Sequence, residues 1–320
     1  MGPDMGKAIA YLRAFGCHLP SRVVDNSELA VTLGADPAWI QQATGIGQRR
    51  FAAAEDTVAT LGVRAAADCL ASAGIEAREI GLLLVSSGSG ERRFPGPATA
   101  IGTALGLAGV PAIDLPIASA GSLFGMALAA HLAPAYGNVL VVASEIMSRT
   151  VRMDTEGRDT AILFGDGAGA CLIGEHSGFA RVADSLLCSD GAFAEALTLP
   201  RDAPLHMDGR TIILQASRKI PRAIQELLAR NQRAPADAAA FLMHQANLNL
   251  VSRVAQSLEV SPERFFCNLQ RYGNTSSASL LIAATEWWRA QGGVFPGPVV
   301  FAAFGAGLHW GALLALPAPC

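Results

Sequence analysis

Continuous apolar runs alternate with helical segments along most of the chain. Runs without a regular polar position are typical of strands that are buried on both faces and covered by helices. Residues 56–73 carry apolar positions at helical spacing, with Asp56 as a candidate N-cap and Gly74 as the stop. The pattern therefore predicts an α/β protein. Its predicted strands are residues 81–86, 111–115, 138–144, 167–173, 239–243, 298–304 and 310–316.

Two predicted helices have no polar face. The first spans residues 121–133 and stops at Pro134, and the second spans residues 277–291 and stops at Gly292. A helix that is apolar all round is normally buried, so we expect both inside the molecule. Each follows one strand-like segment and precedes another, which indicates an internal duplication. The expected halves are residues 1–176 and 177–320.

Composition and charge exclude several classes of protein. Of the 320 residues, 51% are hydrophobic and 16% are charged, which fits a large buried core and differs from a disordered composition. The net charge of −3 gives no reason to expect nucleic acid or an anionic membrane as a partner. No apolar run approaches the ~18 residues that span a bilayer, so we expect a soluble, cytoplasmic protein.

The cysteines do not have the spacing of a metal site. None lies in a CxxC pair and most stand in apolar stretches, so we expect buried free thiols, no disulfide and no metal. Residues 1–7, which include a second methionine at Met5, are set aside from the fold prediction. The six cysteines are Cys17, Cys69, Cys171, Cys188, Cys267 and Cys320.

Ser119 is the first candidate for chemistry. Residues 118–123 read Ala-Ser-Ala-Gly-Ser-Leu and lie where a predicted strand turns into the first apolar helix. Free N–H groups at a helix N-terminus favour negative charge, so the position suits an acyl-transfer nucleophile. A hydroxyl must lose its proton as it attacks, which requires a base within hydrogen-bond reach. Taken alone, Ser119 could equally be a capping serine.

His244 and Asn274 are the other two candidates. His244 opens a His-Gln-Ala-Asn sequence directly after the strand predicted over residues 239–243. Asn274 lies in a Gly-Asn-Thr-Ser turn before the second apolar helix. A lone histidine at the end of a buried strand is usually a core residue. A neutral imidazole near Ser119 could instead accept its proton.

In this order and at about this spacing, the three motifs resemble those of the β-ketoacyl-acyl-carrier-protein synthase III family of the thiolase superfamily. The resemblance implies a thiolase-like fold, with five layers (α-β-α-β-α) built from two duplicated halves. In that family a cysteine stands at the position of Ser119 and takes an acyl group from acyl-CoA. His244 and Asn274 would then donate hydrogen bonds to the thioester carbonyl of a malonyl group. No cofactor is implied, because acyl-CoA is a substrate.

The resemblance extends to binding residues. The glycine loop at residues 304–311 implies a second oxyanion N–H at Ala306, beside that of Ser119, although the family usually has glycine there. Residues 164–170 are glycine-rich but lack the lysine and serine of a phosphate loop, so a packed turn is expected. His309 is a further polar residue near the loop. The residues implied to bind acyl-CoA or its acyl group are Trp39, Arg158, Phe94, Met207, Asn247 and Phe304, with Leu205 beside them.

The resemblance also implies partners, namely acyl-CoA, an acyl carrier protein and a second copy of the chain whose acyl pocket Phe94 would close. Cationic positions that serve coenzyme A or the carrier protein are altered, however. Ala43 and Asn249 stand where arginines are expected, and Gln256 replaces a lysine. A predicted helix carries Arg218, Lys219 and Arg222, which form either a substitute docking face or an ordinary solvated face.

Three functions are compatible with this sequence. The first is an acyltransferase of secondary metabolism that uses Ser119 to load a starter unit. The second is a synthase III in which serine has replaced the catalytic cysteine, so that condensation is nearly lost. The third is a non-catalytic subunit of a heteromeric condensing enzyme. The altered cationic positions and the serine together point away from routine fatty-acid initiation.

Overall fold

A single hydrogen-bonded sheet runs through the molecule. The computed structural model describes residues 10–200 and 202–318, and within them ten strands pair in the order β12-β11-β13-β14-β8-β1-β7-β6-β4-β5. These strands are β1 (Ala10–His18), β4 (Ile80–Ser86), β5 (Ala112–Leu115), β6 (Asn138–Ile146), β7 (Asp166–Gly174), β8 (Ala180–Ser189), β11 (Ala240–Met243), β12 (Phe265–Phe266), β13 (Val299–Gly305) and β14 (His309–Pro317).

The strand order repeats. In β5-β4-β6-β7-β1 the first two pairings are parallel and the next two antiparallel, and β12-β11-β13-β14-β8 repeats that pattern. The two sets join where β1 pairs antiparallel with β8, through Tyr11 opposite Arg181 and its neighbours. The boundary expected at residues 176/177 falls in the loop between β7 and β8.

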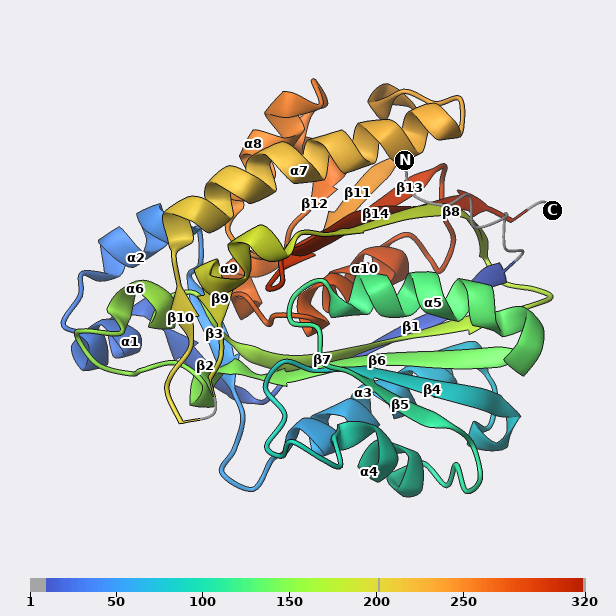
Figure 1. Ribbon diagram of the computed structural model, residues 1–320, viewed down its shortest axis with the longest axis horizontal. Coiled ribbons are helices and arrows are strands. Elements are labelled where there is room, and N and C mark those ends of the chain that lie inside the picture. The colour runs from blue at the N-terminus through green and yellow to red at the C-terminus, as the bar shows by residue number, and fades with distance from the viewer. Residues whose placement is uncertain (1–9, 201, 319–320) are drawn as a thin grey trace.

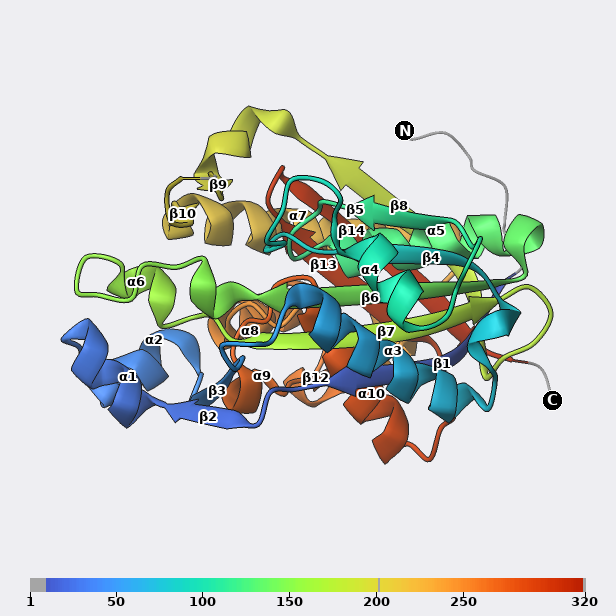
Figure 2. The same cartoon turned by 90° about the horizontal axis from the view of Figure 1, so that it is seen from below.

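Helices and sheet form five layers (Figures 1 and 2). Helices α5 (Gly121–Tyr136) and α10 (Ala278–Ala290) lie in the middle layer, between the two halves of the sheet. The outer layers are α7 (Gly209–Arg230) with α8 (Leu248–Ser257) on one side, and α3 (Val58–Ala73) with α4 (Pro97–Ala104) on the other. The mixed α/β, thiolase-like architecture and the burial of both apolar helices are therefore confirmed.

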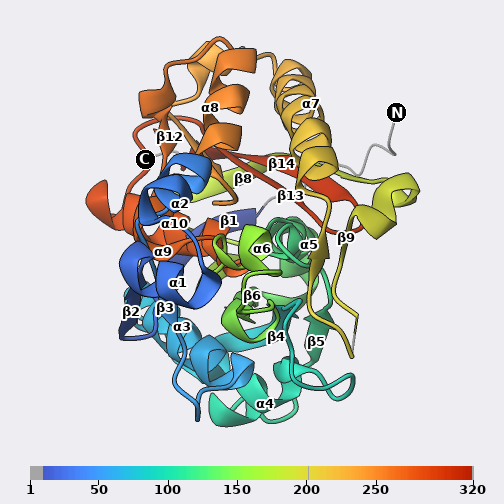
Figure 3. The same cartoon turned by 90° about the vertical axis from the view of Figure 1, so that its left-hand side faces the viewer.

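Smaller elements gather at one end of the molecule, which faces the viewer in Figure 3. Helices α1, α2 and α6 lie there, close to the pairs β2–β3 and β9–β10. The bounds are α1 (Asn26–Leu33), α2 (Pro37–Thr44), α6 (Arg158–Ala161), α9 (Leu269–Tyr272), β2 (Arg22–Asp25), β3 (Gln48–Phe51), β9 (Leu197–Thr198) and β10 (His206–Met207). The 3₁₀ turns are η1 (Ala77–Glu79), η2 (Met147–Arg149), η3 (Gly191–Ala196), η4 (Pro235–Asp237) and η5 (Pro262–Arg264).

Two helix boundaries differ from the prediction. Thr57, not Asp56, caps α3: its hydroxyl accepts from the Thr60 N–H, while Asp56 accepts from Ala53. Helix α5 continues through Pro134 to Tyr136 and closes with the Gly137 N–H on the Ala133 carbonyl, 2.7 Å away. A proline in the last turn removes one helical hydrogen bond, and the buried apolar surface of α5 outweighs that loss.

Two central strands, β1 and β8, were not predicted. Both carry polar residues within them, such as Arg13 in β1 and Asp184 in β8, so neither shows the continuous apolar run used to recognise the other strands.

Residues 1–7, set aside above, lie outside the described residues, as does Cys320. Cys69 and Cys171 are buried, and the other described cysteines are free but only half-buried. No helix within the described residues is long and apolar enough to cross a membrane.

Candidate functional site

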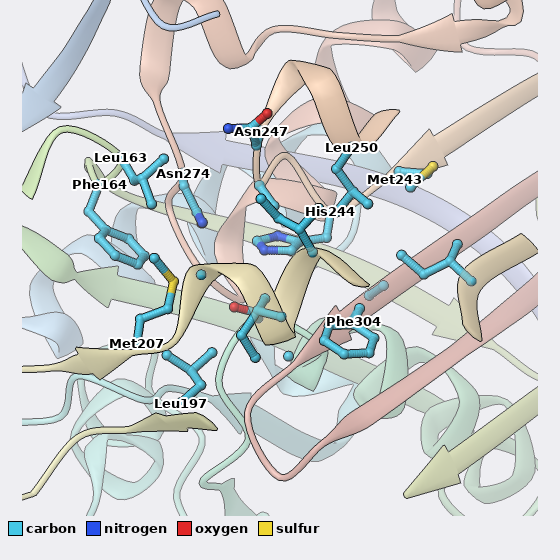
Figure 4. A pocket seen from close by; sticks show the side chains of 18 residues that line it. Leu163, Phe164, Leu197, Met207, Met243, His244, Asn247, Leu250, Asn274 and Phe304 are labelled. Atoms are coloured by element: carbon cyan, nitrogen blue, oxygen red, sulfur yellow. The ribbon is translucent and has the colours of Figure 1, made fainter. Parts of the chain in front are cut away.

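The fold brings the three candidate residues to one cavity. Ser119 directly precedes the α5 cap, His244 follows β11, and Asn274 lies between α9 and α10. All three line a cavity that encloses about 720 Å³ of empty space, part of it open to solvent (Figure 4). Their exposed fractions are only 7%, 6% and 7%. The nucleophile position thus comes from the first half of the chain and its two partners from the second.

Ser119 has an unusual backbone conformation. Its φ of +60° lies in the left-handed region, which costs a non-glycine residue about 1–3 kcal/mol and is typical of functional sites. The surroundings leave it little freedom: a Cβ on Gly305 would lie 2.3 Å from the Ala118 carbonyl and 2.8 Å from the Ser119 Cβ. Among the described residues, no side chain or backbone group forms a hydrogen bond with the Ser119 hydroxyl. The backbone at Ser119 is therefore held in place, and its hydroxyl is available to a substrate.

His244 is buried in its neutral form. Its Nδ1 lies 2.6 Å from the Ser279 hydroxyl oxygen, which also accepts from the Gln245 N–H at 3.1 Å. Burial lowers the pKa of His244 to about 4, because desolvation disfavours the cation more than the hydrogen bond with the Ser276 carbonyl favours it. With Nδ1 engaged, Nε2 is the nitrogen available to the cavity. Of the residues that line the two cavities at Ser119, His244 alone has a side chain that can act as a general base.

The low pKa of His244 predicts an unusual pH dependence. We expect log kcat/KM to stay level as the pH falls from 8 to about 5, and to drop only near pH 4, where the free enzyme's imidazole becomes charged. An ordinary histidine would give the drop near pH 6.5. The measurement is a kcat/KM profile, with circular dichroism at each pH to show that the chain is folded. A drop centred near 6.5 in folded protein contradicts this expectation.

Asn274 is oriented by its own turn. Its side-chain oxygen accepts from the Ser276 N–H at 2.9 Å, which leaves the amide NH₂ to face the cavity (Figure 4). Its backbone is tied to the neighbouring segment: the Asn274 N–H donates to the Leu163 carbonyl at 2.8 Å, and the Gly165 N–H donates to the Asn274 carbonyl at 3.1 Å. The amide is thus positioned as a hydrogen-bond donor.

The glycine-rich segment at residues 164–170 packs as a structural element. It forms the start of β7, where the buried Asp166 carboxylate accepts from the Ala52 N–H and from both the N–H and the hydroxyl of Ser148. Gly165 is needed for close packing, because a Cβ there would lie 2.3 Å from the Tyr272 carbonyl. These contacts favour the packed turn over a phosphate-binding loop.

Arg49 supports the same region and was missed in the sequence. Its side chain is fully buried and donates to the Asn26 side-chain oxygen and to the Ile162 carbonyl, both at 2.7 Å. Burial lowers the pKa of Arg49 to about 10. The guanidinium fixes Ile162 next to the Leu163 carbonyl that binds Asn274. Nothing in the sequence marks Arg49 as buried.

A second cavity opens on the other side of Ser119. It encloses about 370 Å³ and shares Ser119, Phe164 and Leu197 with the first cavity. Met207 and Phe304 line the first cavity, whereas Leu205 and Ala306 line the second. Ser119 therefore stands at the junction of two largely apolar spaces. This arrangement lets a nucleophile receive a group from one side and hold it on the other.

A buried carboxylate braces the second cavity and was also missed. Glu145, at the end of β6, is fully buried and accepts from the Gly88 N–H, the Ser89 hydroxyl and the Ser277 hydroxyl, the last two at 2.6 Å. Gly88 lines this cavity, and Ser277 is the residue directly before α10. Glu145 thus joins the loop after β4 to the start of the helix that follows Asn274.

Two backbone N–H groups near Ser119 can serve an oxyanion. The Ser119 N–H donates to the Ser276 hydroxyl at 3.1 Å, so a substrate oxygen would displace that partner. The Ala306 N–H forms no hydrogen bond with any described residue. Ala306 is also absent from the described residues with positive φ, so its methyl group in place of the family's glycine introduces no left-handed strain.

Comparison with known proteins agrees with this geometry. The family model for the 3-oxoacyl-[acyl-carrier-protein] synthase III matches residues 113–191, and that for its C-terminal part matches residues 228–316. A beta-ketoacyl-[acyl-carrier-protein] synthase III of Oleidesulfovibrio alaskensis is 36% identical, over 95% of this chain and 98% of the relative. The chain belongs to the synthase III family. Members of this family are condensing acyltransferases.

Solved structures of the synthase III family are closely similar. That of the 3-oxoacyl-[acyl-carrier-protein] synthase III from Aquifex aeolicus VF5 has a TM-score of 0.91 and 30% identity, and covers 97% of this chain and 100% of its own. The priming beta-ketosynthase from the R1128 polyketide biosynthetic pathway has a TM-score of 0.89 and 30% identity, and covers 98% of both chains. The synthase III fold therefore extends over nearly the whole chain.

The outer rim of this chain carries Trp39 and Arg158. The Arg158 guanidinium lies over the Trp39 ring, 5.8 Å from its centroid, and joins α6 to α2. Neither residue lines the two cavities at Ser119. The pair offers an aromatic face on which a base can stack and a cation that can bind a phosphate.

Neighbouring rim positions are neutral and occupied by internal hydrogen bonds. The side-chain amides of Asn247 and Asn249 both donate to the Ala43 carbonyl, at 3.1 and 3.3 Å. The Asn247 oxygen caps α8 by accepting from the Asn249 N–H. Asn247 also lines the larger cavity. Ala43 and Asn249, which stand where the family has arginines, are thus bonded to each other. Neither presents a charge to a phosphate.

The remaining candidates lie away from the cavities. Phe94 is 83% exposed on the loop before α4 and lines neither cavity of its own chain. His309 also lines neither and is bonded to Ser189. Of the predicted cationic group Arg218, Lys219 and Arg222, Lys219 has internal partners: it forms a 2.8 Å ion pair with Asp190 and lies over the Trp310 ring.

Proposed function

We propose that this chain is a serine-dependent acyltransferase of the synthase III type. Ser119 takes an acyl group from acyl-CoA and passes it to a malonyl thioester or another acceptor, as in fatty-acid or polyketide biosynthesis. The observation that carries the proposal is the position of Ser119, where two cavities, one neutral imidazole and two backbone N–H groups converge. An acyl-enzyme intermediate needs each of these features.

The first half-reaction uses His244 as a base. The Ser119 oxygen attacks the thioester carbonyl while Nε2 of His244 takes its proton, and the Ser119 and Ala306 N–H groups hold the developing oxyanion. The carbon–sulfur bond then breaks, and the imidazolium returns the proton to the leaving thiolate. The products are an ester on Ser119 and free coenzyme A. The pKa of His244, about 4, keeps the imidazole neutral at the start of each cycle.

The second half-reaction uses His244 and Asn274 as donors. Both donate to the thioester carbonyl of the malonyl group, which stabilises the enolate formed when carbon dioxide leaves. The enolate carbon attacks the ester, the bond between the acyl carbon and the Ser119 oxygen breaks, and the Ser119 alkoxide takes up one proton from solvent, which the loss of carbon dioxide requires. His244 must now carry its proton on Nε2. The Ser279 hydroxyl can accept from Nδ1 or donate to it, so it supports both tautomers that the two half-reactions require.

Intact-protein mass spectrometry tests this function. The enzyme is incubated with acetyl-, propionyl- and longer acyl-CoAs, and we expect a mass increase equal to one acyl group on Ser119. The absence of an adduct with every donor would overturn the proposal. Malonyl decarboxylation without any adduct would indicate a condensation-deficient synthase III. Addition of malonyl-CoA or a malonyl-carrier protein to the adduct shows which acceptor discharges it.

Trp39→Ala should weaken acyl-CoA binding without affecting the chemistry. Loss of the ring that packs against Arg158 is expected to raise KM for acyl-CoA about tenfold and leave kcat unchanged, because the pair lies outside both cavities. Acyl-pantetheine lacks the nucleotide and provides the control, since its KM should not change. An equal loss with both donors would show that Trp39 does not contact the nucleotide.

Partners and location follow from the same proposal. We propose a homodimer in which Phe94, which is highly exposed, closes the acyl cavity of the second copy. The half-exposed Ile113 on the edge strand β5 offers apolar surface to the same interface. The neutral rim around Ala43 favours weak docking of a carrier protein. Free thiols in the described part of the chain suit the reducing cytoplasm.

A further inference from the structure

The loop that carries Ala306 is held by the segment that follows β8. The Asp190 N–H donates to the Leu308 carbonyl at 2.9 Å, and the Leu308 N–H donates back to the Asp190 carbonyl at 3.0 Å. One residue earlier, the Ser189 hydroxyl lies 2.7 Å from Nδ1 of His309. Residues 305–308, termed here the oxyanion loop, are therefore fixed from one side by Ser189 and Asp190.

Lys219 connects this support to helix α7. Its ammonium group donates to the Asp190 carboxylate at 2.8 Å and lies 4.0 Å from the centroid of the Trp310 ring. The two charged side chains are only 19% and 32% exposed. The hydrogen bond from Lys219 is the main cause that lowers the pKa of the Asp190 carboxyl. The same carboxylate accepts from the Ala192 N–H and so caps η3.

The segments on both sides of this contact reach the substrate cavities. Helix α7 contributes Ile212 and Ile220 to the larger cavity. Turn η3 leads directly into β9, whose residues Leu197 and Thr198 line the smaller one. The Lys219–Asp190 pair therefore joins two cavity walls and the oxyanion loop at one point.

We propose that Lys219 is a positioning residue, which holds Asp190 and thereby sets the oxyanion loop relative to Ser119. This inference rests on the proposed acyl transfer, because that reaction requires the Ala306 N–H at the oxyanion. The loop packs closely against the nucleophile, since a Cβ on Gly305 would lie 2.3 Å from the Ala118 carbonyl oxygen and 2.8 Å from the Ser119 Cβ. A small displacement of the loop thus changes the distance from the Ala306 N–H to the substrate oxygen. The strength of that hydrogen bond depends steeply on this distance.

A purely structural role makes a different prediction. If the Lys219–Asp190 ion pair only stabilised the fold, its loss would lower the melting temperature without affecting the reaction. Loss of a positioning residue instead slows the chemical step while substrate binding is unchanged. The experiment must therefore measure binding, chemistry and stability separately.

The test compares Lys219→Met with Arg218→Met. Arg218 is the preceding residue on α7, is exposed and forms no ion pair with any described residue, which makes it a matched loss of one cation. We expect Lys219→Met to slow single-turnover acylation by acetyl-CoA about tenfold, with unchanged Kd for acetyl-CoA, and Arg218→Met to behave as wild type. Lys219→Arg should recover most of the rate, because it restores the cation beside Asp190 and Trp310.

Hydrogen exchange of residues 304–309 provides a readout that does not depend on activity. We expect faster exchange of this peptide in Lys219→Met and in Asp190→Asn, the second variant guarding against misfolding of the first. The inference would be overturned if Lys219→Met and Asp190→Asn both acylate at the wild-type rate and both show the wild-type rate of hydrogen exchange. A wild-type protein that no acyl-CoA acylates refutes the proposed function, and the exchange data then decide alone whether Lys219 holds the loop.

Discussion

Ser119→Ala is expected to abolish the acyl adduct and to lower turnover at least about 10³-fold. The substitution removes only the hydroxyl oxygen, which has no hydrogen-bond partner among the described residues and faces both cavities. The left-handed backbone at this position is equally strained for serine and alanine, so the fold should not change. The measurements are adduct mass with acetyl-CoA and steady-state release of coenzyme A.

The chain supplies a matched control for this substitution. Ser122 lies three residues further on in α5, is fully buried, and its hydroxyl has no hydrogen-bond partner. Removal of an unsatisfied buried hydroxyl costs little, so Ser122→Ala should keep the adduct, the rate and the stability of wild type. An adduct that persists in Ser119→Ala would place the acyl group on another residue and refute the serine mechanism.

His244→Ala is expected to slow Ser119 acylation and condensation by about 10²–10³-fold each. His244 is the one general base among the residues that line the two cavities, and a serine hydroxyl cannot attack a thioester efficiently without one. The neighbouring residues should tolerate the change, because the Ser279 hydroxyl still accepts from the Gln245 N–H. Single-turnover acylation and product formation from a malonyl thioester are measured separately.

Asn274→Ala separates the two roles of His244. Asn274 serves only the malonyl carbonyl in the proposed mechanism, so its loss should slow condensation by a similar factor and leave acylation near the wild-type rate. The pair of variants therefore distinguishes the base from the donor. If His244→Ala acylates as fast as wild type, His244 is not the base, and its role is confined to the second half-reaction.

The fold could be inferred largely from the sequence because buried strands and buried helices leave apolar runs. Helices α5 and α10 were recognised in this way, and their central position in the molecule follows from the missing polar face. The strands β1 and β8 escaped because Arg13, Arg181 and Asp184 interrupt their apolar pattern. Arg13 donates to Asn138, and Asp184 accepts from Arg230 and Asn231. A pattern read along one segment does not reveal these contacts with distant residues.

The site was less predictable than the fold. Ser119, His244 and Asn274 stand at the ends of apolar segments, where topology brings them together. Ser276 and Ser279 were overlooked because their roles depend on which way a hydroxyl points within the same turn. The behaviour of Lys219 also depends on contacts between distant segments, since the sequence shows a cation on a helix and gives no sign of Asp190 or Trp310 beside it.

The order of the site residues along the chain has a consequence for protein synthesis. The β5–α5 turn emerges from the ribosome well before the segments that hold His244, Asn274 and Ala306. A nascent chain whose first half has folded presents a serine without its base, its amide donor or one of its oxyanion groups. Unfinished or truncated chains should therefore be unable to sequester activated acyl groups, and the chemistry begins only when β13 is paired next to β11.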